Sequence, residues 1–403
     1  MRYTIGQLAE IIDGDRGKNY PKQDEFYPQG YCLFLNTGNV TKEGLIFEEN
    51  QFIMKEKDEA LRKGKLKRGD IVYTTRGTVG NAGYYNSSVP YENLRINSGM
   101  VILRSNGEIV DARFLYQILK SEYYRPYFKQ YCTGSAQPQL PIKNFSQIYL
   151  NVPDIKTQHR IADILSVYDD LIENNQKQIK LLEEAAQRLY KEWFVDLRFP
   201  GHENTKIVDG VPEGWQWCKV RDVADINSSA LPKNYKEDFI DYVDLGSVRC
   251  GHIETRTRYN LNEAPGRAKR CAKDGDIIWG MVRPNLKAYA LVTNPKETDV
   301  FSTGFAVLSA KKVPYSYLYC AVTQEEFVGY LVNATNGAAY PAVKPVHFEV
   351  ADILKPDDKV LEQFHSVADL IYRKKEALEN QNHNLRESRD LILPKLMSGE
   401  LEV

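Results

Sequence analysis

The sequence has few of the features that mark an enzyme, a metalloprotein or a membrane protein. Its six cysteines are scattered and form no CxxC pair, so they support neither a zinc site nor a disulfide framework. It contains no GxxxxGK[ST] phosphate loop, no HExxH and no GxSxG. An Asn/Asp-Pro-Pro-Phe/Tyr stretch, typical of adenine methyltransferases, is also missing. We therefore expect no catalytic residue, no metal site and no cofactor of its own.

Long apolar runs are missing as well. No stretch approaches the roughly 18 to 20 apolar residues needed to span a bilayer. The first residues, Met1–Asp15, lack a basic segment followed by an apolar run. We expect no signal peptide, no membrane contact and a cytoplasmic location.

Excess charge of one sign is the third missing feature, since the net charge is −1 over 403 residues. The length suggests two or three domains. Basic residues exceed acidic ones by four in residues 1–156, whereas acidic residues exceed basic ones by two in 157–199 and by three in 357–403. Residues 200–356 are neutral. This distribution permits DNA binding in the two larger segments but does not indicate it by itself.

The chain resembles itself at a period near 206 residues, the kind of signal that should be sought before any motif. Four stretches match in order at separations of 206, 205, 203 and 206: Lys67–Tyr73 with Lys273–Trp279, Ser98–Leu103 with Thr303–Leu308, Gly134–Leu140 with Gly337–Val343, and His159–Leu165 with His365–Ile371. A fifth match joins Tyr3–Ile11 to Cys218–Ile226. The repeating unit is therefore a globular segment followed by a long helix.

Each half has the same expected anatomy. Short β-type runs lie between Gly- and Pro-rich turns and are followed by a short helix, at Ala112–Leu119 in the first half and Tyr315–Val322 in the second. A long helical pattern closes each half, Thr157–Phe194 and Asp358–Met397. The predicted domains are 1–156 and 200–356, and the predicted helical segments are 157–199 and 357–403.

The first long helix has an apolar seam at alternating steps of four and three, the heptad period of a left-handed coiled coil. Its members include Ile161, Leu165, Tyr168, Ile172, Asn175, Ile179 and Leu182. Adding 206 gives a poorer seam in the second helix, with Val367, Lys374, Leu378, Gln381 and Leu385 among its members. Asn175 and Gln381 are then equivalent polar residues. We predict that the two helices pair antiparallel; the alternative is that each packs only on its own domain.

Several motifs resemble the specificity subunits of type I restriction-modification systems. They are Gln158–Leu165 and Leu181–Phe194 in the central region, Val211–Trp217 before the second globular segment, and Leu391–Leu401 near the end. The resemblance implies an α+β fold in which two target-recognition domains, related by a pseudo-twofold axis, are separated by two long antiparallel coiled-coil helices. It also implies a non-catalytic subunit that binds double-stranded DNA and recruits two methyltransferase subunits and a restriction subunit. S-adenosylmethionine, ATP and Mg²⁺ would be bound only by those partners.

A rigid helix pair suits a split target, because two readers must keep a fixed distance and helical phase. The two globular segments differ strongly in sequence, so we expect an asymmetric bipartite target. Loops that follow predicted strands hold side chains suited to bases or phosphates. The candidates are Thr74, Thr75, Arg76, Gln137 and Gln139 in the first segment, and Arg283, Asn285, Lys287, Tyr340 and Lys344 in the second.

Two basic runs, Arg62–Arg68 and Arg267–Lys273, could contact phosphates. For each single candidate, an ordinary solvated charge or turn residue is the competing interpretation. For the whole chain, the alternative is a coiled-coil scaffold that joins two partner proteins without DNA specificity.

Overall fold

The computed structural model describes residues 1–47, 50–134, 137–335 and 341–402. The chain divides into two compact units. The first comprises Met1–Asn174 with Asn382–Val403, and the second comprises Asn175–Gln381. Each unit contains one globular body and a part of both long helices, α6 (Ile155–Tyr190) and α11 (Asp358–Ser398).

The first unit is organised around an antiparallel sheet. Its strands follow the order β2 (Ala9–Asp13), β10 (Met100–Ser105), β7 (Ile71–Thr74) and β8 (Ala82–Tyr84). Helix α3 (Ala112–Lys120) packs against this sheet, with its first turn capped by the Asp111 carboxylate. Most residues of β7 and β10 are buried, as expected for strands covered on both faces.

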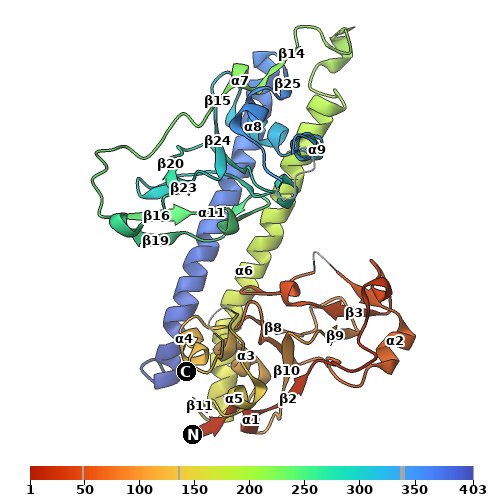
Figure 1. Cartoon of the computed structure of the whole chain (residues 1–403), viewed down its shortest axis with the longest axis vertical. Coiled ribbons are helices and arrows are strands. Elements are labelled where there is room, and N and C mark those ends of the chain that lie inside the picture. Colours follow the sequence, from red (N-terminus) through yellow and green to blue (C-terminus); the bar gives the residue numbers. More distant parts are fainter. Residues whose placement is uncertain (48–49, 135–136, 336–340, 403) are drawn as a thin grey trace. The chain divides into compact units, whose positions relative to one another are not determined.

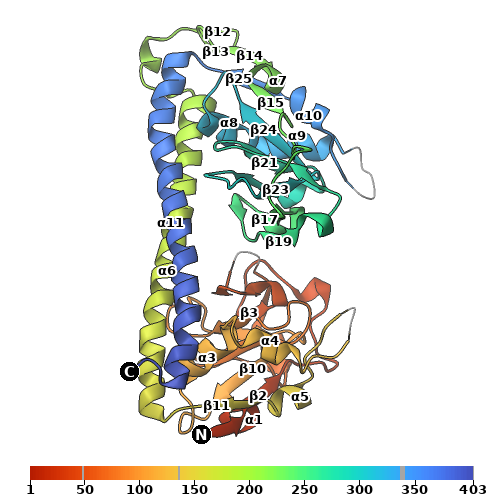
Figure 2. The same ribbon diagram turned by 90° about the vertical axis from the view of Figure 1, so that its left-hand side faces the viewer.

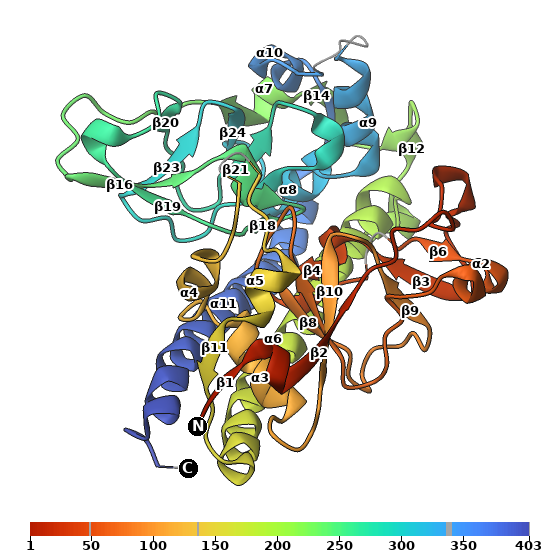
Figure 3. The same cartoon turned by 60° about the horizontal axis from the view of Figure 1, so that its bottom comes forward.

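A smaller sheet lies beside it, with strand β3 (Cys32–Leu35) between β6 (Phe52–Ile53) and β9 (Leu94–Ile96). Figure 3 shows this sheet and helix α2 next to the four-stranded sheet. The remaining elements are β1 (Arg2–Thr4), α1 (Ile5–Leu8), β4 (Val40–Thr41), β5 (Gly44–Leu45), α2 (Lys55–Ala60), α4 (Arg125–Lys129), α5 (Ile142–Ser146) and β11 (Tyr149–Asn151). Strands β1 and β11 pair with each other.

The second unit has the same strand order in its main sheet, β15 (Ala224–Ile226), β24 (Phe305–Ala310), β21 (Ile277–Gly280) and β22 (Tyr289–Leu291) (Figure 1). Its smaller sheet has the order β19 (Thr257–Asn260), β16 (Phe239–Val243), β23 (Asp299–Ser302) and β20 (Ala268–Arg270). In both units the smaller sheet contains a parallel strand pair, β3 with the edge strand β9 in the first and the two central strands β16 and β23 in the second.

Three further hairpin or end pairs complete the strands of the second unit. They are β12 (Ile207–Val208) with β13 (Val211–Pro212), β14 (Gln216–Lys219) with β25 (Asp352–Lys355), and β17 (Val248–Arg249) with β18 (His252–Ile253). Its shorter helices are α7 (Val220–Val223), α8 (Tyr315–Val322), α9 (Glu325–Asn333) and α10 (Pro345–Glu349).

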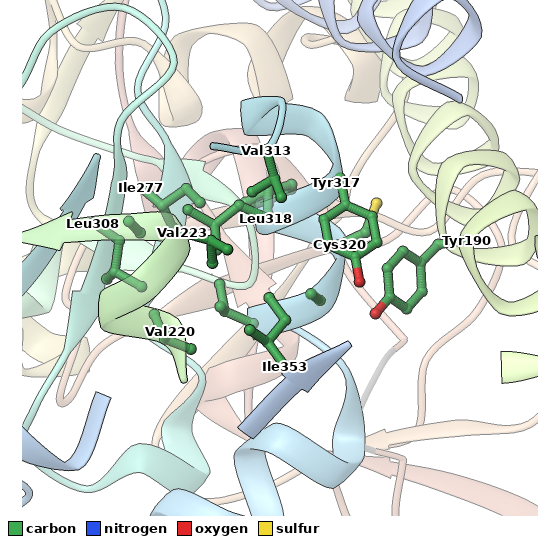
Figure 4. Close-up of a cluster of buried hydrophobic side chains, with 14 of the residues drawn as sticks. Tyr190, Val220, Val223, Ile277, Leu308, Val313, Tyr317, Leu318, Cys320 and Ile353 are labelled. Carbon is green, nitrogen blue, oxygen red and sulfur yellow. The ribbon is translucent and has the colours of Figure 1, made fainter. Parts of the chain in front are cut away.

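Helix α8 joins the main sheet of the second unit to the long helices (Figure 2). It is apolar on nearly all sides and almost wholly buried. Figure 4 shows Tyr317, Leu318 and Cys320 of α8 between side chains of the sheet and Tyr190 of α6. Because this core is continuous, the globular body of the second unit and its helices are packed as one unit.

The two long helices run antiparallel within each unit (Figure 2). In the first unit, Arg389 Nη1 lies 2.9 Å from Asp169 Oδ1. In the second unit, Lys375 Nζ lies 3.2 Å from Glu183 Oε1. Partner numbers fall along α11 as they rise along α6, which defines an antiparallel pair. The predicted fold class, α+β with an antiparallel pair of long helices, is confirmed.

Candidate nucleic-acid interface

Two of the predicted contact residues are buried in the turn after β7. Thr74 is fully buried, and its hydroxyl donates to the Thr78 carbonyl and accepts from the Asn81 N–H. Thr75 is also buried, and its hydroxyl donates to the carbonyl of Gly99. Both hydroxyls satisfy backbone groups of the turn, which is a common role for threonine. Thr74 is thus closed to solvent, whereas Thr75, though buried, is among the residues that line a cavity at this surface.

Arg76 and Gln139 are brought together, as neighbours in an antiparallel bridge on the surface. Gln139 also exchanges two backbone hydrogen bonds with Thr133, and Gln137 is exposed on the same hairpin. A shallow cavity of about 240 Å³ lies here, and Arg16, Arg76 and Gln139 are among its lining residues. Arg16 was not among the predicted contacts, although it lies in a Gly-Asp-Arg-Gly sequence after β2 that is typical of a loop.

The candidates of the second unit lie around the turn between β21 and β22. Arg283 and Lys287 both have positive φ, 50° and 52°, and flank a short helical turn that carries the exposed Asn285. Lys287 Nζ lies 2.5 Å from Glu325 Oε1, so its charge is already paired. Lys344 is exposed at the start of α10. The predicted Tyr340 lies outside the described residues.

Backbone hydrogen bonds identify which positions of the two units correspond. In the first unit, Thr75 N–H donates to Gly99 and its carbonyl accepts from Leu140. In the second unit, Met281 makes the same two bonds, with Gly304 and Val343. The bridge Arg76–Gln139 therefore corresponds to the bridge Val282–Ala342.

By this correspondence the position equivalent to Arg76 is Val282, one residue before the candidate Arg283. The backbone is alike in the two units, whereas one bridge carries a cation and an amide and the other carries two apolar side chains. Loops of this kind can present different chemistry from one scaffold.

The basic run Arg62–Arg68 is mostly engaged within the first unit. Arg62 pairs with Asp15, and Lys65 pairs with Asp58. Arg68 donates to three backbone carbonyls and stacks on the Tyr85 ring. Three of the five basic side chains thus contact the first unit itself, while Lys63 and Lys67 are exposed. In the second run, Arg267, Lys269 and Lys273 are exposed.

The seam of α6 has the expected burial. Ile161, Leu165, Ile172, Asn175 and Ile179 are buried. Tyr168 and Leu182 are half-buried.

In α11 the buried positions lie partly one residue later than the seam transferred from α6. Val367 and Lys374 are exposed, while Ala368 and Lys375 are buried. Leu378 is buried, Leu385 is half-buried and Gln381 is largely exposed. The shift arises because α11 also packs against the globular body of the second unit through Phe364 and Tyr372.

Asn175 Nδ2 nonetheless donates to Gln381 Oε1 over 3.1 Å. The two residues that the repeat places at equivalent positions therefore contact each other. They are also the first and the last residue of the second unit.

Charged groups accompany the seam in both units. In the first, Asp169 accepts from Lys120, Gln117 and Arg389; burial acts to raise its pKa, but the two cations lower it below the usual range. In the second, burial opposes the charged form of His252, but hydrogen bonds to Glu183 and Glu379 raise its pKa to about 9.

Two general features of the described residues bear on function. No three His, Cys, Asp or Glu side chains in these ranges come together as a metal site. None of the helices in the described ranges is both long enough and apolar enough to cross a membrane.

Comparisons with known proteins support the resemblance seen in the sequence motifs. Residues 1–184 match the family model described as the type I restriction modification DNA specificity domain. The chain is 26% identical over 360 residues to the MjaIX specificity subunit of Methanocaldococcus jannaschii, covering 86% of this chain and 81% of that protein. It is 23% identical to the HindI specificity subunit of Haemophilus influenzae, covering 98% of this chain and all of that protein.

The fold is also that of a solved relative. A crystal structure of the type I restriction-modification S subunit from M. genitalium has a TM-score of 0.53 at 15% identity, and the match covers 98% of this chain and 95% of that one. This similarity concerns the fold alone. The resemblance seen in the sequence motifs is confirmed: over nearly its whole length the chain is similar to type I restriction-modification specificity subunits.

Proposed function

We propose that this chain reads an asymmetric, bipartite DNA target and positions two adenine methyltransferase subunits on it. Each of the predicted domains 1–156 and 200–356 would read one part of the target. A restriction subunit would join the same assembly. S-adenosylmethionine, ATP and Mg²⁺ would act on the partner subunits, and this chain would perform no chemical step itself. We retain the expectation of a cytoplasmic location.

One observation carries the proposal: the two units share a loop framework but differ in the side chains it presents. At equivalent bridges the first unit has Arg76 and Gln139, and the second has Val282 and Ala342. Arginine favours guanine edges and glutamine favours adenine edges, whereas valine and alanine can only contact apolar groups such as a thymine methyl. Two such readers would recognise different base sequences, which makes the target asymmetric.

The long helices supply a second line of support, for partner binding. Ile164 and Leu370 lie at positions 206 residues apart, and both are exposed, at 38% and 69%. Val167 and Leu171 extend the exposed apolar face of α6 by a further helical turn. Exposed apolar side chains at helical spacing are typical of protein interfaces. An exposed apolar side chain at this one equivalent position of the two helices would suit two copies of one partner.

The test is a change of base preference in one part of the target only. The methylated target is first read from genomic N6-methyladenine with and without this chain. Binding to duplexes that carry single changes in that target is then measured with the methyltransferase present. Arg76→Ala should relax discrimination at one position of one half-site by about 1–3 kcal/mol and leave the other half unchanged. Arg221→Ala, which removes an exposed arginine of α7, is the matched control.

Two outcomes would contradict the proposal. If Arg76→Ala weakens all duplexes equally, Arg76 is a phosphate contact and does not read a base. If the complex binds scrambled and split-site DNA equally at every salt concentration, the chain is a scaffold that joins partner proteins without specificity.

A further inference from the structure

Two partly buried ion pairs connect the long helices, one within each unit. In the first unit Asp169 of α6 pairs with Arg389 of α11, and in the second Glu183 of α6 pairs with Lys375 of α11. Positions 169 and 375 are 206 residues apart, and so are 183 and 389. The two pairs therefore occupy equivalent positions of the repeat. Their charges, however, are reversed, because both acids lie on α6 and both bases lie on α11.

These charges are held in place by the globular bodies as well as by each other. Arg389 and Lys375 have side chains only 10% and 8% exposed, and Asp169 is 20% exposed. Lys120 of α3 also pairs with Asp169. In the second unit His252 lies between Glu183 and Glu379, and Lys375 Nζ donates to the carbonyl of Gly251. Because these contacts restrict the side-chain conformations, the charges have little freedom to rotate away from a like charge on another helix.

The reversal matters when the alternatives to the observed pairing are considered. If α6 of one molecule paired antiparallel with α6 of another, Asp169 would face Glu183 at both ends of the contact. If α11 paired with α11, Lys375 would face Arg389 at both ends. Like charges in contact at a partly buried interface are strongly unfavourable. Only the α6–α11 combination places an acid against a base in both units.

The polar pair at the centre does not make this distinction. Asn175 and Gln381 are equivalent positions and contact each other. Pairing of like helices would replace them by Asn–Asn or Gln–Gln, and both amide pairs can form a hydrogen bond. The charged pairs, and not the polar pair, therefore distinguish the α6–α11 pairing from the pairing of like helices.

We propose that Asp169, Glu183, Lys375 and Arg389 form a charge code that makes α6 accept only the basic face of an α11 helix and excludes a second copy of itself. The code prevents assembly of two identical halves. The pairing argument stands without any role in DNA binding. Its consequence, that a reader of two identical half-sites cannot form, rests on the proposed function.

The test starts from the intact, folded chain. A protease site is inserted between Asp209 and Gly210, in the exposed hairpin of β12 and β13, and the folded protein is cut there. The cut protein is incubated in dilute urea, at a concentration where isotope-labelled and unlabelled fragments exchange completely. After the urea is removed, native mass spectrometry counts complexes of unlike and like fragments. The wild type should give almost only the unlike pair.

The informative variant is Glu183→Lys with Lys375→Glu. It keeps an acid opposite a base in the second unit, but it also makes both like-helix pairings attractive, because Asp169 would face the introduced lysine and Arg389 would face the introduced glutamate. Complexes of like fragments should rise about tenfold or more, toward the statistical mixture. The pair Glu183→Gln with Lys375→Gln removes the like-charge contacts without new charges, and it serves if the swapped protein does not fold.

The matched control moves the same charges between the same helices on their exposed faces, Asp170→Lys with Lys374→Glu. It should leave the pairing as in the wild type. The proposal is overturned if the wild type itself yields the statistical mixture. It is also overturned if either seam variant, folded and exchanging, stays as selective as the wild type. Neither result touches the reading of DNA, which is measured separately.

Discussion

Two equivalent aspartates allow a prediction about how each unit is stabilised. Asp70 and Asp276 end the same turn, in which the backbone N–H of the residue three positions earlier donates to the carboxylate. Both are almost fully buried. Asp70 receives two further bonds from Arg104, of 2.9 and 2.8 Å. The place of Arg104 is taken by Ser309 in the second unit, and among the described residues Asp276 Oδ1 has no hydrogen-bond partner.

The two substitutions to asparagine should therefore have different effects. Asp70→Asn removes a bidentate ion pair and sets an amide N–H against the guanidinium of Arg104, which is 27% exposed. A fully buried pair broken in this way costs about 3–5 kcal/mol. Partial exposure of the arginine lowers the expected loss to about 2–3 kcal/mol.

Asp276 is different because burial raises its pKa, and the Lys273 N–H and the Ser309 hydroxyl offset this only in part. A carboxyl whose pKa is raised on folding destabilises the folded state wherever it must be ionised, at neutral pH and above. Asp276→Asn removes that charge and keeps the acceptor for Lys273. The expected effect lies between no change and a gain of about 1 kcal/mol at pH 7.

The assay can follow each unit by itself. All four tryptophans, Trp193, Trp215, Trp217 and Trp279, lie in the second unit, so tryptophan fluorescence in urea reports only on that unit. Hydrogen exchange of β7 and β10 peptides reports on the first unit. Asp70→Asn should lower protection of those strands, while Asp276→Asn should leave the fluorescence midpoint unchanged or raised. Equal losses in the two units would refute the reasoning, because they would mean that the ion pair with Arg104 contributes nothing.

Two further predictions concern the helices. The pKa of His252 is about 9 in the folded protein and 6.5 as a reference value, so its contribution to stability is complete below pH 6.5 and is lost as the pH rises through 9. The urea midpoint of the wild type should therefore approach that of His252→Gln as the pH is raised from 6.5 to 9. A difference between the two midpoints that stays constant over this range would contradict the assignment. Four residues inserted in both helices, after Asn174 and after Gln381, should lengthen the gap between two unchanged half-sites by about two base pairs, because four helical residues span about 6 Å. Sequencing of genomic N6-methyladenine measures the length of this gap. The same insertion in α6 alone should abolish methylation.

Regular patterns in the sequence predicted most of the elements. The short helix expected at Tyr315–Val322 has those bounds. The long helix expected from Asp358 begins there. These elements were predictable because periodicity and turn residues act locally. The Lys-x-Gly-Asp turns were visible for the same reason, since a glycine with positive φ and an aspartate that caps the turn are required at fixed positions.

The candidate site was harder to predict because burial depends on tertiary contacts. Thr74 and Thr75 follow a strand just as Arg76 does, and only the fold shows that their hydroxyls are used by Thr78 and Gly99. The repeat itself aligned these loops as the backbone does, since the separations of 206 and 203 residues carry Arg76 to Val282 and Gln139 to Ala342. The seam of α11 was displaced for a related reason: a helix that packs on a domain as well as on a partner does not keep a pure heptad pattern.

The opposite charges of α6 and α11 explain why two units of similar fold need not be interchangeable. A duplicated chain begins with identical halves, for which pairing of like and unlike helices is equally favourable. Once α6 holds the acids and α11 holds the bases, each helix requires the other, and the loops of the two units are free to diverge because they always occur together. The bridge of Arg76 and Gln139 in the first unit and the equivalent bridge of Val282 and Ala342 in the second are an example of such divergence on a common backbone. Asymmetry in the helix charges thus allows asymmetry in the loops, and a variant in which like helices pair should be the one in which a symmetric reader first becomes possible.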